Sequence, residues 1–285
     1  MIVRWTHTMP IIGAASLVLG SVILTSPSRA ASPRHQPSAH GQPVPAPSSS
    51  QPFWIMSTQS LYSLEQHPAA LRGLAHHVVY VFAPPRSHTP LVPPPPSAGI
   101  IVKRTAYFRS LTSLQTAMAH HQLRVDQAVL LDLEHWIFTP SVEQAHIPAT
   151  YAQAARLLAH TGLILIGSPS TREIVASAPY LAIADLQIQQ TEFHPDTYRA
   201  KALQLVRQIH AVAPHTLITA GLSTNPRTGT ATPAILARAY QAVRPFVSGF
   251  WMNEPSPGPG CPQCQLHHPQ AAWGFFAWLG QSVKP

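Results

Sequence analysis

Eight short runs rich in apolar residues recur along the chain, and helix-like segments separate most of them. Most of these runs are continuously apolar, which is typical of parallel strands covered on both faces. Strands that alternate with helices indicate an α/β fold, and eight such units predict a closed (β/α)8 barrel of the TIM type. The predicted strands cover residues 53–58, 78–82, 100–103, 129–134, 163–168, 184–190, 217–223 and 247–252.

Helix boundary signals agree with this fold. Residues 170–173, Ser-Thr-Arg-Glu, form a capping box that opens a short helix. Asp196 is placed to cap a longer helix that runs through residue 210. Thr232 is an N-cap followed by proline at the first helical position, and Gly162 ends a helix that begins near residue 151.

Two segments decide the strand count. The connection at 83–96 is rich in proline, cannot be helical, and is expected to be a stiff surface loop. If the run at 100–103 after it is not a strand, the tail at 271–279 supplies the eighth. With 100–103 counted as a strand, that tail is predicted to be a closing helix.

The first 30 residues resemble an export signal. Arg4 gives the positive start, and residues 11–25 form an apolar run of the length of a signal-peptide core. Small residues at Ser28 and Ala30 predict cleavage after Ala30. An uncleaved membrane anchor is the alternative interpretation of the same run, and would be the chain's one membrane contact.

Residues 31–52 are rich in Ser, Pro, Gln, Ala and Gly, which predicts a disordered linker. Residues 53–285 are then expected to form a single barrel domain. We expect a secreted, extracellular protein, tethered to the cell surface if the N-terminal segment stays uncleaved.

Charge excludes one class of partner. The formal net charge is +8, but the Lys and Arg residues are scattered singly, without the basic run that grips a nucleic-acid backbone. We therefore expect no nucleic-acid partner, although a weak attraction to anionic surface polymers is compatible with this charge. The sequence has only 10 Asp and Glu residues, so two acids close together gain weight.

The fourth predicted strand ends in two such acids. Asp132 and Glu134 are spaced i, i+2, so they share one face of an extended chain. Burying two carboxylates is costly unless the site uses them. In a barrel, the carboxyl ends of the strands build the active site.

Other polar and aromatic residues fall near strand ends, and together they suit a sugar. Amides and carboxylates can bond its hydroxyls, and an aromatic ring can lie on its C–H face. The candidate substrate-binding residues are Tyr80, Trp136, Gln187, Gln189, Trp251 and Asn253.

On these residues the chain resembles the glycoside hydrolase superfamily of barrels, and within it the chitinase-like family 18 proteins. In that family an Asp-x-Asp-x-Glu ending on the fourth strand supplies the proton donor, and a Trp commonly ends the eighth. Here Asp132-Leu133-Glu134 matches the end of the motif, while the earlier positions fall on Gln127 and Leu130. The family's Met-x-Tyr-Asp pattern on the sixth strand is absent.

The resemblance implies substrate-assisted hydrolysis, with Glu134 as general acid and Asp132 orienting the acyl group of the substrate. The seventh predicted strand carries no acid, which argues against the large group of hydrolases whose nucleophile stands there. Glu192 and Glu254 are further candidates for a second carboxylate. We expect no cofactor and no metal, and a monomer that binds a carbohydrate or cell-wall polymer.

Structural interpretations of the same residues remain open. Asp132 and Glu134 can instead pair with Lys103 or Arg104 in a buried ion network. The two glutamines can bond each other inside the barrel, and Trp251 can be core. A non-catalytic glycan-binding barrel is therefore the alternative to a glycosidase.

Cys261 and Cys264 follow the eighth strand and are the only cysteines. In an oxidising compartment two cysteines at this spacing favour a small-loop disulfide. A zinc site with His267 or His268 and a pair of free thiols are the alternatives.

Overall fold

The computed structural model describes residues 51–83, 99–259, 261–262, 264 and 268–282. The predicted signal segment, nearly all of the predicted linker and the proline-rich connection lie outside this part of the chain. Across the residues that the structure describes, no helix is both long and apolar enough to cross a membrane.

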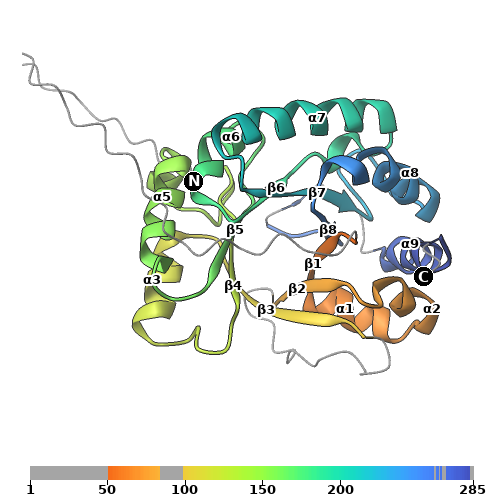
Figure 1. The fold of residues 1–285 in the computed structure, drawn as a ribbon, viewed down its shortest axis with the longest axis horizontal. Helices are drawn as coiled ribbons and strands as arrows, with labels where there is room; N and C mark the ends of the chain where they lie inside the picture. The colour runs from red at the N-terminus through yellow and green to blue at the C-terminus, as the bar shows by residue number, and fades with distance from the viewer. Residues whose placement is uncertain (1–50, 84–98, 260, 263, 265–267, 283–285) are drawn as a thin grey trace, which may run out of the picture. The chain divides into compact units, whose positions relative to one another are not determined.

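Eight parallel strands close into a barrel in sequence order, which confirms the predicted (β/α)8 fold (Figure 1). Each strand pairs with its neighbours along the chain, and β1 closes the ring against β8. The strands are β1 Phe53–Ser57, β2 Val78–Phe82, β3 Ile101–Phe108, β4 Ala128–Leu131, β5 Ile164–Gly167, β6 Ile183–Leu186, β7 Leu217–Ser223 and β8 Gly249–Asn253.

Differences between the observed and predicted bounds of β3, β4 and β6 affect the candidate site. β3 extends five residues beyond the predicted end at 103, so it is a strand and the acidic strand is the fourth. β4 ends at Leu131, so Asp132 and Glu134 lie just after the strand rather than inside it. β6 ends at Leu186, and Gln189 begins a 3-10 helix at Gln189–Thr191.

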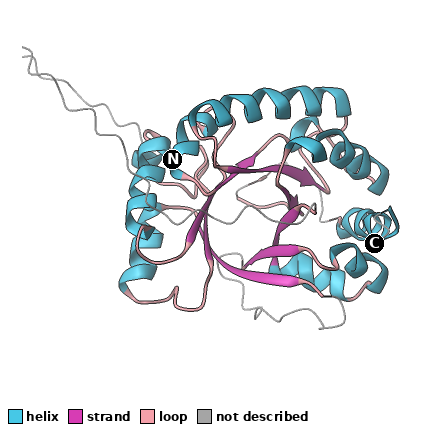
Figure 2. Cartoon of the chain, viewed as in Figure 1, coloured by secondary structure: helices cyan, strands magenta, loops and turns pink. Residues whose placement is uncertain are grey.

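Helices form a layer outside the strands (Figure 2). The α-helices are α1 Thr58–Glu65, α2 Pro68–Leu71, α3 Leu111–Ala119, α4 Ser141–Gln144, α5 Ile147–Leu158, α6 Ile174–Ser177, α7 Pro195–Val212, α8 Pro233–Val243 and α9 Pro269–Ser282. The tail is therefore a closing helix, as predicted, and it packs beside α2 and α8.

The structure confirms some of the predicted helix caps and contradicts one. The Thr232 side chain accepts a hydrogen bond from the backbone N–H of Ile235, as an N-cap should. Gly162 adopts a positive φ of 76° in the turn after α5, which suits glycine. The prediction for Asp196 was wrong: α7 begins at Pro195, so Asp196 lies in its first turn and not at the cap. The capping-box residue Glu173 precedes α6 as its N-cap residue.

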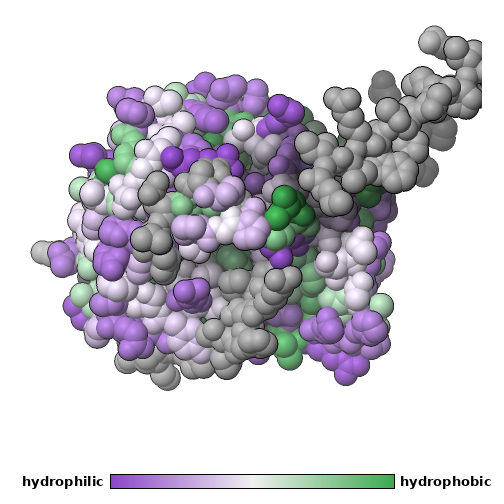
Figure 3. Space-filling view, turned by 180° about the vertical axis from the view of Figure 1, so that it is seen from behind, coloured by the Kyte–Doolittle hydropathy of each residue, from purple (hydrophilic) through white to green (hydrophobic). Residues whose placement is uncertain are grey.

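The core has two layers, because side chains alternate between the two faces of each strand. In β1, Phe53 and Ile55 point into the barrel, whereas Trp54 points outward. Trp54 is fully buried and stacks on Phe250, with ring centroids 5.3 Å apart. Burial on both faces explains why the strands read as continuous apolar runs. The face seen in Figure 3 accordingly carries many hydrophilic residues and only small hydrophobic areas.

Candidate functional site

A cavity of about 380 Å³ opens at the carboxyl ends of the strands, and we call it the rim cavity. Residues of β2, β3, β6, β7 and β8 and of the segments after β4, β6 and β7 line it, and part of the loop after β8 forms one wall. Its principal lining residues are Phe82, Tyr107, Asp132, Glu134, Trp136, Asp185, Gln187, Gln189, Ser223, Arg227, Trp251 and Asn253.

Asp132 lies on the floor of the rim cavity and is 95% buried, with 5% of its surface exposed. The Tyr107 hydroxyl donates a hydrogen bond of 2.7 Å to its Oδ2. Its Oδ1 has no hydrogen-bond partner among the described residues. Burial raises the pKa of Asp132 well above its ordinary range, and the nearby Glu134 raises it further.

Glu134 is half-buried and reaches the same cavity. The side-chain amide of Gln187 donates a hydrogen bond to its Oε1. Burial raises the pKa of Glu134, while the bond from Gln187 and the positive charge of Arg227 oppose the shift. A carboxyl group with a raised pKa that faces a cavity has the properties of a general acid.

Lys103 and Arg104 do not form the alternative ion network around Asp132 and Glu134. Lys103 lines a different cavity, at the amino ends of the strands. Arg104 lies near Asp126, where its charge opposes the rise that burial causes in the pKa of Asp126. The partners of Asp132 and Glu134 are instead neutral hydrogen-bond donors.

Asp185 on β6 is a third acid of the rim cavity, and sequence reasoning missed it. It is buried and accepts hydrogen bonds from Thr219 Oγ1 at 2.8 Å and Ser168 Oγ at 3.1 Å. Burial raises its pKa to about 7, despite those two bonds. The available signal was its i, i+2 spacing from Gln187, which places both near one strand end.

Gln187 connects two of the acids. Its Nε2 lies within hydrogen-bond distance of Glu134, of Ser168 Oγ at 2.9 Å and of the Ser168 carbonyl at 3.1 Å. Ser168 in turn donates to Asp185. Polar contacts therefore run from Glu134 through Gln187 and Ser168 to Asp185 across three strand ends.

The aromatic candidates divide between the two ends of the barrel. Trp251 lines the rim cavity and packs edge-to-face on Phe82, with ring centroids 5.5 Å apart. Trp136 also lines it, and its Nε1 donates to Thr139 Oγ1 at 2.8 Å. Tyr80 lines the cavity at the amino ends of the strands instead. Tyr107 supplies the tyrosine hydroxyl at the rim.

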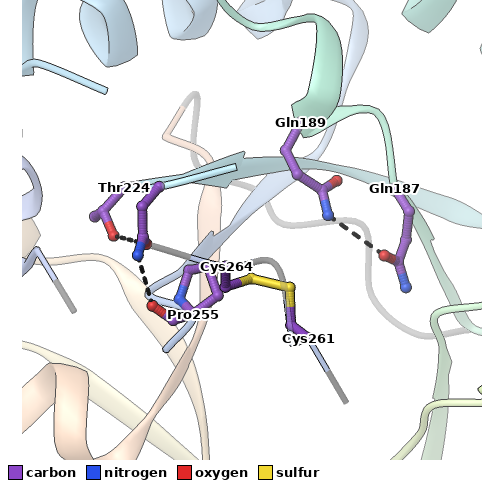
Figure 4. The surroundings of a disulfide bond; sticks show 7 residues. Gln187, Gln189, Thr224, Pro255, Cys261 and Cys264 are labelled. Atoms are coloured by element: carbon purple, nitrogen blue, oxygen red, sulfur yellow. Dashed lines mark hydrogen bonds between the residues drawn. A yellow bond between two sulfur atoms is a disulfide. The ribbon is translucent and has the colours of Figure 1, made fainter. Parts of the chain in front are cut away.

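Asn253 and Gln189 line the rim cavity with Gln187, and the Gln189 amide donates to Gln187 Oε1 at 3.4 Å (Figure 4). The additional acids do not join them. Glu192 is fully buried and accepts a hydrogen bond of 2.9 Å from the Ser223 N–H. Neither Glu192 nor Glu254 is among the residues that line the cavity.

Cys261 and Cys264 form a disulfide, and both line the rim cavity (Figure 4). The segment before them is held to the residues that follow β7 by the Asn225 side chain, which donates to the Pro255 carbonyl at 2.9 Å. His267 lies outside the described residues. Within the described part of the chain, no group of three or more His, Cys, Asp or Glu residues is arranged to hold a metal ion.

No protein-family model matches the chain, and no curated protein matches it in sequence. Among solved structures, a fructose-1,6-biphosphate aldolase assigned as putative, from Coccidioides immitis, is similar at 10% identity and a TM-score of 0.46, over 82% of this chain and 88% of that one. A glycoside hydrolase family 17 β-1,3-glucanosyltransferase from Rhizomucor miehei is similar at 9% identity and a TM-score of 0.41, over 72% of this chain and 88% of that one. Sph3 from Aspergillus clavatus, solved with GalNAc, is similar at 9% identity and a TM-score of 0.39, over 80% of this chain and 97% of that one. At these identities the likeness concerns the barrel fold alone.

Proposed function

We propose that this barrel is a glycoside hydrolase that acts on a carbohydrate in the rim cavity, with Glu134 as the proton donor. One observation carries the proposal: Glu134 reaches the cavity beside two buried carboxyl groups, and its carboxylate accepts a hydrogen bond from the neutral amide of Gln187. An ion pair would keep Glu134 ionised, whereas desolvation favours the protonated form that a general acid needs.

Glu134 donates its proton to the glycosidic oxygen as the bond to the anomeric carbon breaks, and the leaving group departs as an alcohol. In the substrate-assisted form of this reaction, the carbonyl oxygen of a substrate acyl group attacks the anomeric carbon. Water then opens the cyclic intermediate and gives its proton to Glu134. Asp132 orients the acyl group through Oδ1, the oxygen that lacks a partner among the described residues.

The aromatic residues support a sugar as the substrate. Phe82, Tyr107 and Trp251 line the cavity, and Phe82 stacks on Tyr107 with ring centroids 5.1 Å apart. Aromatic faces bind the C–H face of a sugar ring, and the amides of Gln189 and Asn253 can bond its hydroxyls. This combination favours a carbohydrate over a purely apolar ligand.

Hydrolysis of a panel of chromogenic glycosides and polymeric glycans tests the proposal. We expect Glu134→Gln to lower kcat by about 10² to 10⁴-fold, because it removes the proton donor while retaining the side-chain shape. Glu65→Gln is the matched control. Glu65 ends α1, is also partly buried with a raised pKa, and lies away from the rim cavity, so its variant should retain full activity.

A non-catalytic glycan-binding barrel is the second candidate. It is favoured by the contacts of Gln187, whose amide donates a hydrogen bond to one oxygen of the Glu134 carboxylate. Glycan binding without hydrolysis by both wild type and Glu134→Gln would replace the first proposal with this one. Hydrolysis that persists in Glu134→Gln would remove Glu134 from the mechanism.

The exported location belongs to the same proposal, since an extracellular glycan is met outside the cell. Mass measurement of the mature chain from culture medium tests it. A chain that begins at Ala31 supports export with cleavage, and an intact N-terminus in a membrane fraction supports the anchor.

A further inference from the structure

A second cavity, of about 500 Å³, lies at the amino ends of the strands, opposite the rim cavity. We call it the basal cavity. In barrels of this fold the amino-end face usually serves stability, and the interior is filled by side chains. Here a lysine, a tyrosine and an aspartate line the basal cavity beside apolar groups. Packing of the barrel interior alone does not require these polar residues.

Lys103 points into the barrel. It is the register partner of Tyr80 on the adjacent strand, and both residues line the basal cavity. Tyr107 lies four residues further along β3 and lines the rim cavity, so it shares the inward face with Lys103. Lys103, a half-buried residue, therefore lies beside a tyrosine at one end of the barrel interior.

The Lys103 ammonium makes no ion pair within the described part of the chain. Asp126 lines the same cavity, but the cation that acts on it is Arg104. The Tyr80 hydroxyl likewise makes no hydrogen bond to any residue that the structure describes. Two donors on adjacent strands are thus left for a ligand, and one of them is charged.

The rest of the wall is mixed, with apolar side chains beside Gln51, Gln127 and Thr161. Phe53 and Tyr80 pack edge-to-face with ring centroids 5.5 Å apart, and Val78, Ile164 and Leu217 continue the surface. His77 is held by its Nδ1, which lies 2.7 Å from the Pro52 carbonyl, and burial lowers its pKa. A neutral His77 adds no second cation, so Lys103 is the one cation among the lining residues. Asp126 is the one acid among them, and Arg104 lies near it.

We propose that the basal cavity binds a small organic carboxylate, whose carboxylate group pairs with Lys103 and Tyr80 and whose hydrocarbon body lies against Phe53, Ile164 and Leu217. One ammonium and one hydroxyl match the single charge and two oxygens of a carboxylate. The volume is within the range of cavities that hold small molecules.

Calorimetric titration of the full chain with 3-phenylpropanoate tests the proposal, with the uncharged 3-phenylpropanamide as the matched probe. We expect saturable binding of the carboxylate and at least about tenfold weaker binding of the amide, because the charged hydrogen bond is lost. Lys103→Met should weaken carboxylate binding by a similar factor, while Lys201→Met on α7, outside the barrel, should leave it unchanged.

Nuclear magnetic resonance gives a second readout. The sequence has lysines only at 103, 201 and 284, so ¹³C-dimethylated lysine yields few signals and dimethylation keeps the charge. Addition of 3-phenylpropanoate should shift the signal that Lys103→Arg removes, and leave that of Lys201 in place. Absence of saturable binding to the wild type, or equal binding by Lys103→Met, would overturn the proposal, and neither result bears on hydrolysis at the rim.

Discussion

The hydroxyl of Tyr107 donates a hydrogen bond of 2.7 Å to Oδ2 of Asp132, across the pairing of β3 with β4. Burial raises the pKa of both groups, and the negative charge of Asp132 raises that of Tyr107 further. The bond itself favours the ionised carboxylate, so it limits how far the pKa of Asp132 rises. Tyr107 therefore adjusts the protonation of a buried acid at the rim.

Tyr107→Phe should raise the pKa of Asp132, because the donor that stabilises its ionised form is removed. Titration of the ¹³C-labelled carboxyl signals measures this, with Asp132→Asn used to assign the signal. The variant should also lose about 1–3 kcal/mol of unfolding free energy, since a buried acceptor is left unsatisfied.

Tyr62→Phe in α1 is the control for removing a tyrosine hydroxyl outside the rim cavity. It should leave the Asp132 titration unchanged. An identical titration curve in Tyr107→Phe and wild type would show that the hydrogen bond does not govern the ionisation of Asp132.

Asp185 predicts how stability depends on pH. Its pKa rises from an ordinary value of 3.8 to about 7 in the folded protein. Between these values the folded state binds more protons than the unfolded state, so stability falls as pH rises. The stabilising effect of the neutral carboxyl is complete below about 3.8 and is lost as pH rises through about 7.

Urea denaturation at pH 4.5, 6 and 7.5 checks this expectation. The unfolding free energy of wild type should decline across the series more steeply than that of Asp185→Asn, which cannot ionise. The slopes of unfolding free energy against pH are compared, because the substitution of an amide for a carboxyl also changes stability by an amount that does not depend on pH. Parallel slopes would mean that Asp185 does not titrate in this window.

The barrel itself could be predicted because its signals are local. Continuous apolar runs mark strands buried on both faces, and Thr232 marks the start of α8. Asp132 and Glu134 could be found because two acids after an apolar run are costly to bury. Asp185 carries the same cost but stands inside an apolar run as a single acid, so it was read as part of a strand.

The alternation of side chains along a strand does not predict how deep in the barrel Tyr80 lies. The period of two places Tyr80 and Phe82 on one face of β2, and in the structure that face points into the barrel. It does not say at which depth, because depth depends on the stagger between neighbouring strands. That long-range register places Phe82, two residues later, at the rim, and leaves Tyr80 in the basal cavity.

Gly73, which follows α2, lies so close to the C-terminal helix α9 that a larger residue does not fit there. A Cβ added there would lie 2.0 Å from the backbone oxygen of Phe276 in α9, closer than packed atoms allow. Gly73→Ala should therefore push α9 from α2 and destabilise the fold by about 1–3 kcal/mol or more. Gly258→Ala is the control, because no atom lies within 4 Å of its added Cβ. Thermal unfolding should show a lower Tm for Gly73→Ala alone, and equal Tm values would mean that α9 shifts at no cost.

The Cys261–Cys264 disulfide should hold the wall of the rim cavity more than it holds the fold. It closes a loop of only a few residues, so the chain-entropy estimate limits its effect on unfolding free energy to about 2 kcal/mol. The Cys261→Ser/Cys264→Ser double variant should thus lose no more than about 2 kcal/mol of unfolding free energy in urea, yet be cleaved faster by protease after the rim loop is released. A reducing agent serves as the internal control, since it should speed cleavage of wild type and leave the double variant unchanged. A reductant effect of equal size on both proteins would show that another property of the loop, and not this bond, restrains it.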